Sequence, residues 1–205
     1  MSFLLEINGT TCMINPSKRS GFPLSDARRC DLIFITSEEP ACFDPELVEA
    51  IHGRTYAAVV APAHMLARVG IADKFKVDVK AGDRFSLRGL DVQACKSARP
   101  QSQNPVGFVI SSAKWKVYYS GSTYAFTDMC RIRADVAILP VAGTQCMDAF
   151  AAAGACREMR PKYAIPIAYE RSDSAAASTG EFSSQLPECT KPIVLRPGAA
   201  ARLKK

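Results

Sequence analysis

Three side chains that can do chemistry lie within one short segment, TSEEPAC, at residues 36–42. The adjacent carboxylates of Glu38 and Glu39 can hold a cation, and Cys42 can act as a nucleophile, because the start of a helix favours a thiolate. These three residues are the candidate catalytic residues. The sequence places no histidine as a base for Cys42, so the alternative is that Cys42 is a packed thiol and that both glutamates are solvated.

The chain has only two histidines, so a histidine-rich metal site cannot be built from it. His52 lies at the predicted end of a helix before Gly53, where a positive charge suits the helix dipole. His64 lies in the first turn of a helix that we expect to begin at Pro62. We predict a structural or surface role for His64 rather than a metal ligand.

The eight cysteines are widely spaced, and no Cys-x-x-Cys pair occurs. This spacing removes the strongest local signal for a zinc ribbon or a thioredoxin-like redox site. The N-terminal residues lack a basic region and are typical of a strand that enters a hairpin at Asn8-Gly9, not of a signal peptide. We therefore expect buried, reduced thiols and a cytoplasmic protein.

Strands and helices alternate around the segment at residues 36–42. The apolar runs at 31–35, 56–61, 136–139 and 163–167 predict strands, and helices are predicted after Asp44-Pro45, after Pro62 and over 147–159. Residues 75–119 predict antiparallel strands with hairpins. The C-terminal part predicts a mobile loop over 171–190, a last strand over 192–196 and a basic tail over 199–205.

This alternation favours parallel crossover units, which must coexist with an antiparallel middle. An α/β fold arranged as a four-layer α/β/β/α sandwich with mixed sheets accommodates both. At 205 residues and 48% hydrophobic content, the chain can bury one substantial core. We expect a single domain over residues 1–205.

Several longer motifs follow one another in a characteristic order: DLIFIT before FDPE, VYYSGSTYAFTDM with ADVAILPVAG, then MRPKYAIPIAYE, and IVLRPG near the end. Their order and spacing resemble the short metal-dependent hydrolases of the metallo-β-lactamase-fold superfamily, which are found widely in bacteria and archaea. The motifs span nearly the whole chain. The resemblance implies the four-layer sandwich of that superfamily.

In that family a Thr-His-x-His-x-Asp-His loop follows the strand equivalent to 31–35 and holds one or two zinc-like ions. Such an ion lowers the pKa of its bound water to about 7 and makes hydroxide available for hydrolysis. The resemblance places Thr36 at the threonine. At the ligand positions themselves, this chain has other residues: Ser37, Glu39, Ala41 and Cys42 in the loop, Ser122 in place of the bridging aspartate, and Ala168 in place of the last histidine.

These replacements lead to the expectation of no metal and no cofactor. The leading hypothesis is a pseudoenzyme: a non-catalytic binding or regulatory module that uses the former active-site cleft, or its rim, to recognise an unknown protein or small-molecule partner. One alternative is a hydrolase of the same superfamily with an altered site at Cys42 or at Glu38 and Glu39.

The other alternative is a nucleic-acid-binding protein. The formal charge is +6, and three of those units come from Arg202, Lys204 and Lys205. Trp115 lies beside two tyrosines and two lysines, a combination that also occurs in strands of ordinary cores, and we favour core packing for it. The longest apolar stretch, 56–66, is too short to cross a membrane, which takes roughly 20 residues. A homo-oligomer is compatible with the sequence.

Overall fold

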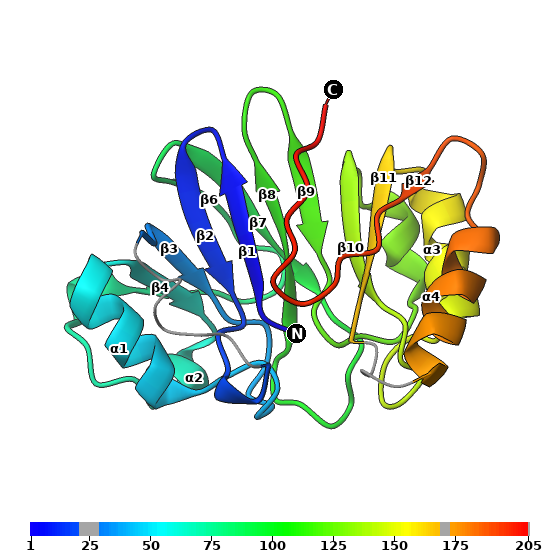
Figure 1. Cartoon of the computed structure of the whole chain (residues 1–205). Helices are drawn as coiled ribbons and strands as arrows, with labels where there is room; N and C mark the ends of the chain where they lie inside the picture. Colours follow the sequence, from blue (N-terminus) through cyan, green and yellow to red (C-terminus); the bar gives the residue numbers. More distant parts are fainter. Residues whose placement is uncertain (21–28, 169–172, 205) are drawn as a thin grey trace. The chain divides into compact units, whose positions relative to one another are not determined.

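The computed structural model describes residues 1–20, 29–168 and 173–204 (Figure 1). The chain divides into two compact units. Unit 1 comprises Met1–Lys96 and Pro100–Gly107, and unit 2 comprises Ser97–Arg99 and Phe108–Lys205. The expectation of one domain over residues 1–205 stays a prediction.

Unit 1 is built on a five-stranded sheet with the strand order β1-β2-β3-β4-β5. Its strands are β1 (Phe3–Ile7), β2 (Thr10–Ile14), β3 (Leu32–Phe34), β4 (Ala58–Ala61) and β5 (Lys76–Asp78). Only β1 and β2 pair antiparallel, and the other neighbours are parallel. The predicted hairpin is confirmed: Asn8 and Gly9 have φ angles of 51° and 76°, as a two-residue type I′ turn requires.

Two helices cover one face of this sheet. Helix α1 (Pro45–Thr55) begins at Asp44, whose carboxylate accepts a hydrogen bond from the backbone N–H of Leu47, as predicted. Helix α2 (Ala63–Leu66) follows Pro62. The core beneath them joins residues of β3 and β4 to both helices: Ile33, Ile35, Val59 and Ala61 pack with Leu47, Val48, Ile51, Met65 and Leu66. Short 3₁₀ turns lie at Lys18–Ser20 and Asp73–Phe75.

The end of α1 differs from the prediction. The helix passes through Gly53 and ends at Thr55, because Tyr56 takes the left-handed cap conformation with φ 55° and donates its N–H to the carbonyl of His52. A left-handed capping residue is usually glycine. Here Tyr56, three residues after the predicted stop at Gly53, takes the strained left-handed conformation instead.

The predicted antiparallel middle region is correct only in part. Strands β6 (Arg84–Leu87) and β7 (Leu90–Lys96) form an antiparallel hairpin around Arg88-Gly89. Strand β5 was expected to be antiparallel too, but it pairs parallel with β4. The reason is that α2 and the turn after it connect β4 to β5, and a helical connection returns the chain in the same direction.

Unit 2 contains β9 (Lys116–Tyr119), β10 (Val136–Pro140), β11 (Tyr163–Ile167) and β12 (Lys191–Pro192), which pair parallel in that order. Strand β8 (Val106–Ser111), whose first two residues belong to unit 1, pairs antiparallel with β9. The helical elements are a 3₁₀ turn at Thr127–Arg131, α3 (Ala149–Met159) and α4 (Asp173–Ser184). Helix α3 contacts β10, and α4 lies beside α3 (Figure 1).

Two predictions near the C-terminus are wrong. The mobile loop expected over 171–190 contains α4, although 171 and 172 lie outside the described residues. Its three successive alanines at 175–177 favour a helix, and the fully buried side chain of Phe182 anchors it. The strand expected over 192–196 is reduced to β12, because Pro192 cannot donate a hydrogen bond to a sheet ladder. None of the described helices is long and apolar enough to cross a membrane.

Candidate functional site

The candidate loop at residues 36–42 follows the carboxyl end of β3. Strands β2 to β5 run parallel, so the segments that follow them meet at one edge of the unit 1 sheet. After β4 the chain continues into Pro62 and α2, and after β5 it continues into Val79 and Lys80. The carboxyl edge of a parallel sheet is where ligands usually bind in α/β proteins.

Asn15 fixes the start of this loop. Its side-chain Oδ1 accepts the backbone N–H of Thr36 at 2.9 Å, and its Nδ2 donates to the Thr36 hydroxyl at 2.8 Å. Asn15 is fully buried and adopts a left-handed backbone with φ 53°. A neutral carboxamide both donates and accepts here, so Thr36 is held without placing a charge in the interior.

The middle of the loop is closed by its own side chains. The Ser37 hydroxyl donates to Oε1 of Glu39 at 3.0 Å, and Ser37 is buried. The backbone N–H groups of Cys42 and Phe43 both donate to the carbonyl of Glu39 at 2.8 Å. Glu39 therefore organises the loop through both its side chain and its backbone.

Cys42 is fully buried, and burial together with the Glu39 carboxylate raises its pKa to about 11. Desolvation penalises the charged thiolate more than the helix start favours it. At neutral pH the thiol is therefore protonated. Burial thus opposes the thiolate that the start of α1 was expected to favour, which weakens Cys42 as a candidate nucleophile.

Glu38 points to different partners from its neighbour Glu39. Its Oε1 accepts the backbone N–H of Gln103 at 2.8 Å, and its Oε2 lies 3.7 Å from Nε2 of His64. Glu38, Glu39 and Cys42 do not come together as a cation site. In residues 1–20, 29–168 and 173–204, no three His, Cys, Asp or Glu side chains gather closely enough to hold a metal ion.

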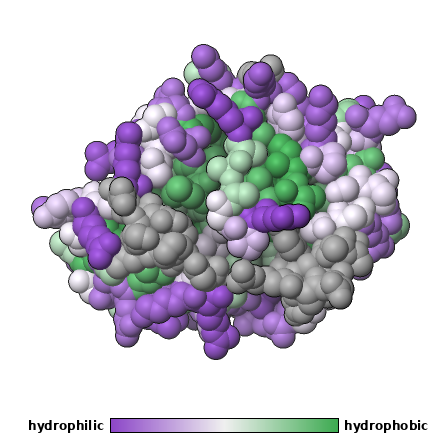
Figure 2. Space-filling model, in the orientation of Figure 1, coloured by the Kyte–Doolittle hydropathy of each residue, from purple (hydrophilic) through white to green (hydrophobic). Residues whose placement is uncertain are grey.

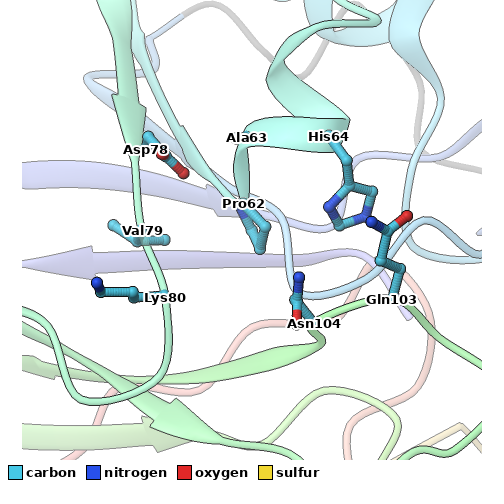
Figure 3. Close-up of a pocket in the computed structure, with 8 residues that line it drawn as sticks. All are labelled: Pro62, Ala63, His64, Asp78, Val79, Lys80, Gln103 and Asn104. Carbon is cyan, nitrogen blue, oxygen red and sulfur yellow. The ribbon is translucent and has the colours of Figure 1, made fainter.

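A pocket of about 280 Å³ opens at the same edge of unit 1 (Figure 3). Its walls come from three segments: the start of α2, the chain just after β5, and the loop before β8. Figure 3 shows Asp78, Val79 and Lys80 on one side, with His64, Gln103 and Asn104 on the other. The sequence patterns gave no sign of this pocket, although the pair Asn104-Pro105 is a turn signal.

The other predicted ligand positions belong to unit 2. Ser122 is buried after β9, and its carbonyl accepts a hydrogen bond from the Ser97 hydroxyl at 3.4 Å. Ala168 ends β11 with a left-handed φ of 57°. Since Ser37, Glu39, Ala41 and Cys42 belong to unit 1, the common cleft that the sequence predicts for all six positions stays a prediction.

The remaining aromatic and histidine residues have structural surroundings. Tyr118 and Tyr119 are fully buried in the core. Trp115, for which core packing was also predicted, is only half-buried, and its ring lies 6.2 Å from that of Tyr163 between centroids. His52, near the end of α1, lies with Nδ1 2.8 Å from the carbonyl of Ala57. Figure 2 shows hydrophilic residues spread over the visible face rather than gathered in one block.

The fold and the matching sequence define the class of protein. Residues 1–168 match the family described as "Beta-lactamase superfamily domain", so the chain belongs to that family. The predicted metallo-β-lactamase-like α/β fold with mixed sheets is thereby confirmed.

Particular relatives come from archaea. The chain is 31% identical over 203 residues to a UPF0173 metal-dependent hydrolase of Pyrococcus furiosus, covering 90% of this chain and 88% of the relative. It is 28% identical over 191 residues to one of Thermoplasma acidophilum, covering 78% and 85%. The structure of Igni18, a novel metallo hydrolase from Ignicoccus hospitalis, has a TM-score of 0.83 at 24% identity and covers 97% and 92% of the two chains.

The residues of the unit 1 loop do not fit the metal pair that this fold family implies. Such a site needs neutral imidazoles and carboxylates with free lone pairs. Ala41 has no donor atom, Cys42 is a buried protonated thiol, and the Glu39 carboxylate is engaged by Ser37. The polar groups of the loop are instead used in hydrogen bonds within the loop and to its neighbours Asn15 and Gln103.

Proposed function

We propose that this chain is a pseudoenzyme of the metallo-β-lactamase fold that binds no metal pair and acts as a non-catalytic binding module. The observation that carries the proposal is the closed loop at residues 36–42. Where the family presents imidazoles, this loop presents a serine bonded to a glutamate and a buried thiol with a pKa of about 11. Without these ligands, the charge and geometry that make metal binding favourable are lost.

The positions of the two histidines support the same proposal. His52 contacts the residue just before β4, at the amino end of that strand, and its ring packs on Phe75 at a centroid distance of 4.7 Å. That end of the sheet is opposite to the loop at 36–42. His64 does lie at the carboxyl edge, but its Nε2 faces Glu38 of the loop rather than joining further ligands. Neither histidine replaces a lost metal ligand.

Metal analysis of the purified full chain tests this proposal. After incubation with zinc, manganese and iron salts and gel filtration, elemental analysis should find no stoichiometric metal. One or two tightly held ions per chain would refute the proposal. The matched control is the fourfold variant S37H, E39H, A41D and C42H, which restores the loop's imidazoles and carboxylate. Metal uptake by this variant alone would tie the loss to these four positions.

The second candidate is a hydrolase with an altered site, and the names of the relatives favour it, since the Pyrococcus and Thermoplasma proteins are called metal-dependent hydrolases. This hypothesis predicts hydrolysis of an activated phosphodiester such as bis(p-nitrophenyl) phosphate by the purified chain. The activity should fall when Glu39→Gln or Cys42→Ala is introduced. Hydrolysis that these variants abolish would replace the binding-module proposal.

A further inference from the structure

The pocket beside Glu38 has walls whose polar side chains are not used within the protein. The side chains of Asp78, Lys80, Gln103 and Asn104 make no hydrogen bond or ion pair with the part of the chain that the structure describes. Charged and carboxamide groups on two separate segments thus line one pocket without hydrogen-bond or ion-pair partners within the described ranges. Sites for small molecules have this character: a concave wall with a few convergent polar groups.

The arrangement of the charges is set by the strand. Val79 is buried and donates its N–H to the carbonyl of Ala61, so the chain here continues the extended course of β5. Successive side chains on an extended strand point to opposite faces. Asp78 and Lys80 therefore share the outer face, with Cα atoms about 7 Å apart. One wall of the pocket thus contains a negative and a positive residue, with Val79 between them (Figure 3).

The opposite wall of the pocket, which contains His64 and Gln103, contacts the Glu38 side chain. The Glu38 carboxylate accepts the backbone N–H of Gln103 through one oxygen and faces Nε2 of His64 with the other. Both of these residues line the pocket. A single side chain from the loop at 36–42 thus holds Gln103 by a hydrogen bond and lies close to His64, so the pocket and the former metal loop are physically connected.

The backbone at Asn104 is a further indication of function. Asn104 has a left-handed φ of 49° although it precedes Pro105, and a residue before proline prefers an extended conformation. Strained backbone of this kind is found at ligand-binding sites more often than elsewhere. In Figure 3 the Gln103 carboxamide lies beside the His64 ring, and the Asn104 carboxamide lies below Pro62, between that pair and Lys80.

We propose that this pocket binds a small zwitterion, a free amino acid with a polar side chain. The carboxylate of Asp78 matches the α-ammonium group, and the ammonium of Lys80 matches the α-carboxylate. The carboxamides of Gln103 and Asn104 each offer a donor and an acceptor to the ligand's side chain. The volume of about 280 Å³ lies just below the range of drug-sized sites and suits so small a molecule.

This inference rests on the proposed binding function and names its ligand, and its test does not depend on the metal content of the chain. The free proteinogenic amino acids are titrated into the ¹⁵N-labelled full chain at up to about 10 mM, a range that reveals weak binding. L-glutamine is the first probe, because its side-chain amide complements a carboxamide. Binding should shift the amide resonances of Ala63, His64, residues 78–80 and residues 103–104.

Derivatives and variants test each charge. N-acetyl-L-glutamine lacks the ammonium group and L-glutaminamide lacks the α-carboxylate, and each should bind about tenfold more weakly than L-glutamine. Lys80→Met should weaken the binding of L-glutamine by a similar factor and leave the binding of L-glutaminamide unchanged. Asp78→Asn should weaken the binding of L-glutamine by a similar factor and leave the binding of N-acetyl-L-glutamine unchanged. Lys74→Met, an exposed lysine of the same unit outside the pocket, is the matched control and should change neither.

The strained asparagine supplies a variant that separates binding from folding. Asn104→Gly relieves the left-handed backbone and removes the carboxamide, so the melting temperature should hold or rise while the affinity falls about tenfold. The inference is overturned if no amino acid shifts the pocket resonances, if both derivatives bind as tightly as L-glutamine, or if a neutral polyol such as glycerol binds more tightly. A metal-loaded chain that still binds amino acids would overturn only the proposed loss of the metal.

Discussion

Oε2 of Glu38 lies 3.7 Å from Nε2 of His64, and neither atom has a hydrogen-bond partner among the described residues. The same carboxylate accepts the N–H of Gln103 through Oε1 at 2.8 Å. Glu38 therefore joins three segments at the carboxyl edge of the unit 1 sheet. In a working metal site, polar groups of the equivalent loop would bind metal ions, whereas here one of them, the Glu38 carboxylate, binds the wall of a pocket.

Truncating Glu38 should loosen the loop that contains Gln103. Glu38→Ala leaves that N–H without its acceptor, whereas Glu38→Gln keeps an acceptor oxygen and removes only the charge. A hydrogen bond to a charged group contributes about 1.5–3 kcal/mol. Hydrogen exchange measured by NMR should therefore show the Gln103 amide exchanging at least about tenfold faster in the alanine variant. The glutamine variant should lie close to the wild type. Equal protection in all three proteins would mean that the bond does not hold the loop.

Asn15 should be a strong determinant of stability in unit 1. Asn15→Gly keeps the left-handed backbone and removes the carboxamide that serves the N–H and hydroxyl of Thr36. Buried polar groups without partners cost about 1–3 kcal/mol each, so urea unfolding should show a loss of about 2 kcal/mol or more. Asn8→Gly is the control, because Asn8 is also left-handed but exposed in a turn. A loss no larger than that of the control would contradict the role given to the carboxamide.

The elements that local chemistry dictates could be predicted from the sequence. The hairpin at Asn8-Gly9 and the helix start at Asp44-Pro45 follow from turn and capping preferences that act over four or five residues. The strand at 163–167 follows in the same way from an apolar run. Helix α4 was missed because serines, a threonine and a glycine surround its three alanines. The burial of Phe182, a tertiary property, stabilises the helix and cannot be read from the local sequence.

The candidate site could be located but not described. The pattern at residues 36–42 placed the loop correctly after β3, and the chain belongs to the family that the motifs resembled. The loop's hydrogen bonds, in contrast, could not be predicted from the sequence. Glu38 and Gln103 are 65 residues apart in the chain, and no local pattern reveals that pairing. The same holds for the burial of Cys42, which reverses the effect expected from the nearby helix start.

Cys189, not Cys42, should be the more reactive of these two thiols. Cys189 is exposed, and its hydrogen bond with the Arg160 side chain lowers its pKa, whereas burial raises the pKa of Cys42 to about 11. Each unit of pKa changes the thiolate fraction about tenfold at neutral pH. Iodoacetamide labelling followed by mass spectrometry should thus modify Cys189 at least about a hundredfold faster than Cys42. Arg160→Met should slow Cys189 alone. Faster labelling of Cys42 would revive the altered-hydrolase hypothesis.

The buried Cys42 should also make the protein lose stability at alkaline pH. Its pKa is raised from 9.0 to about 11 on folding, so above pH 9 the unfolded chain releases this proton while the folded chain keeps it. The unfolded state then binds fewer protons, so the Cys42 thiol alone lowers the free energy of unfolding by about 1.4 kcal/mol per pH unit between pH 9 and 11. The buried thiols of Cys12, Cys30 and Cys156, whose pKa values are also raised, add to this fall. Cys42→Ser removes the titrating group, so its unfolding free energy, measured with urea at pH 8 to 10.5, should fall less steeply than that of the wild type. Cys130→Ser, at a partly exposed thiol of unit 2, should leave the slope unchanged. Parallel curves for Cys42→Ser and the wild type would show that the Cys42 thiol ionises as readily in the folded protein as in the unfolded chain.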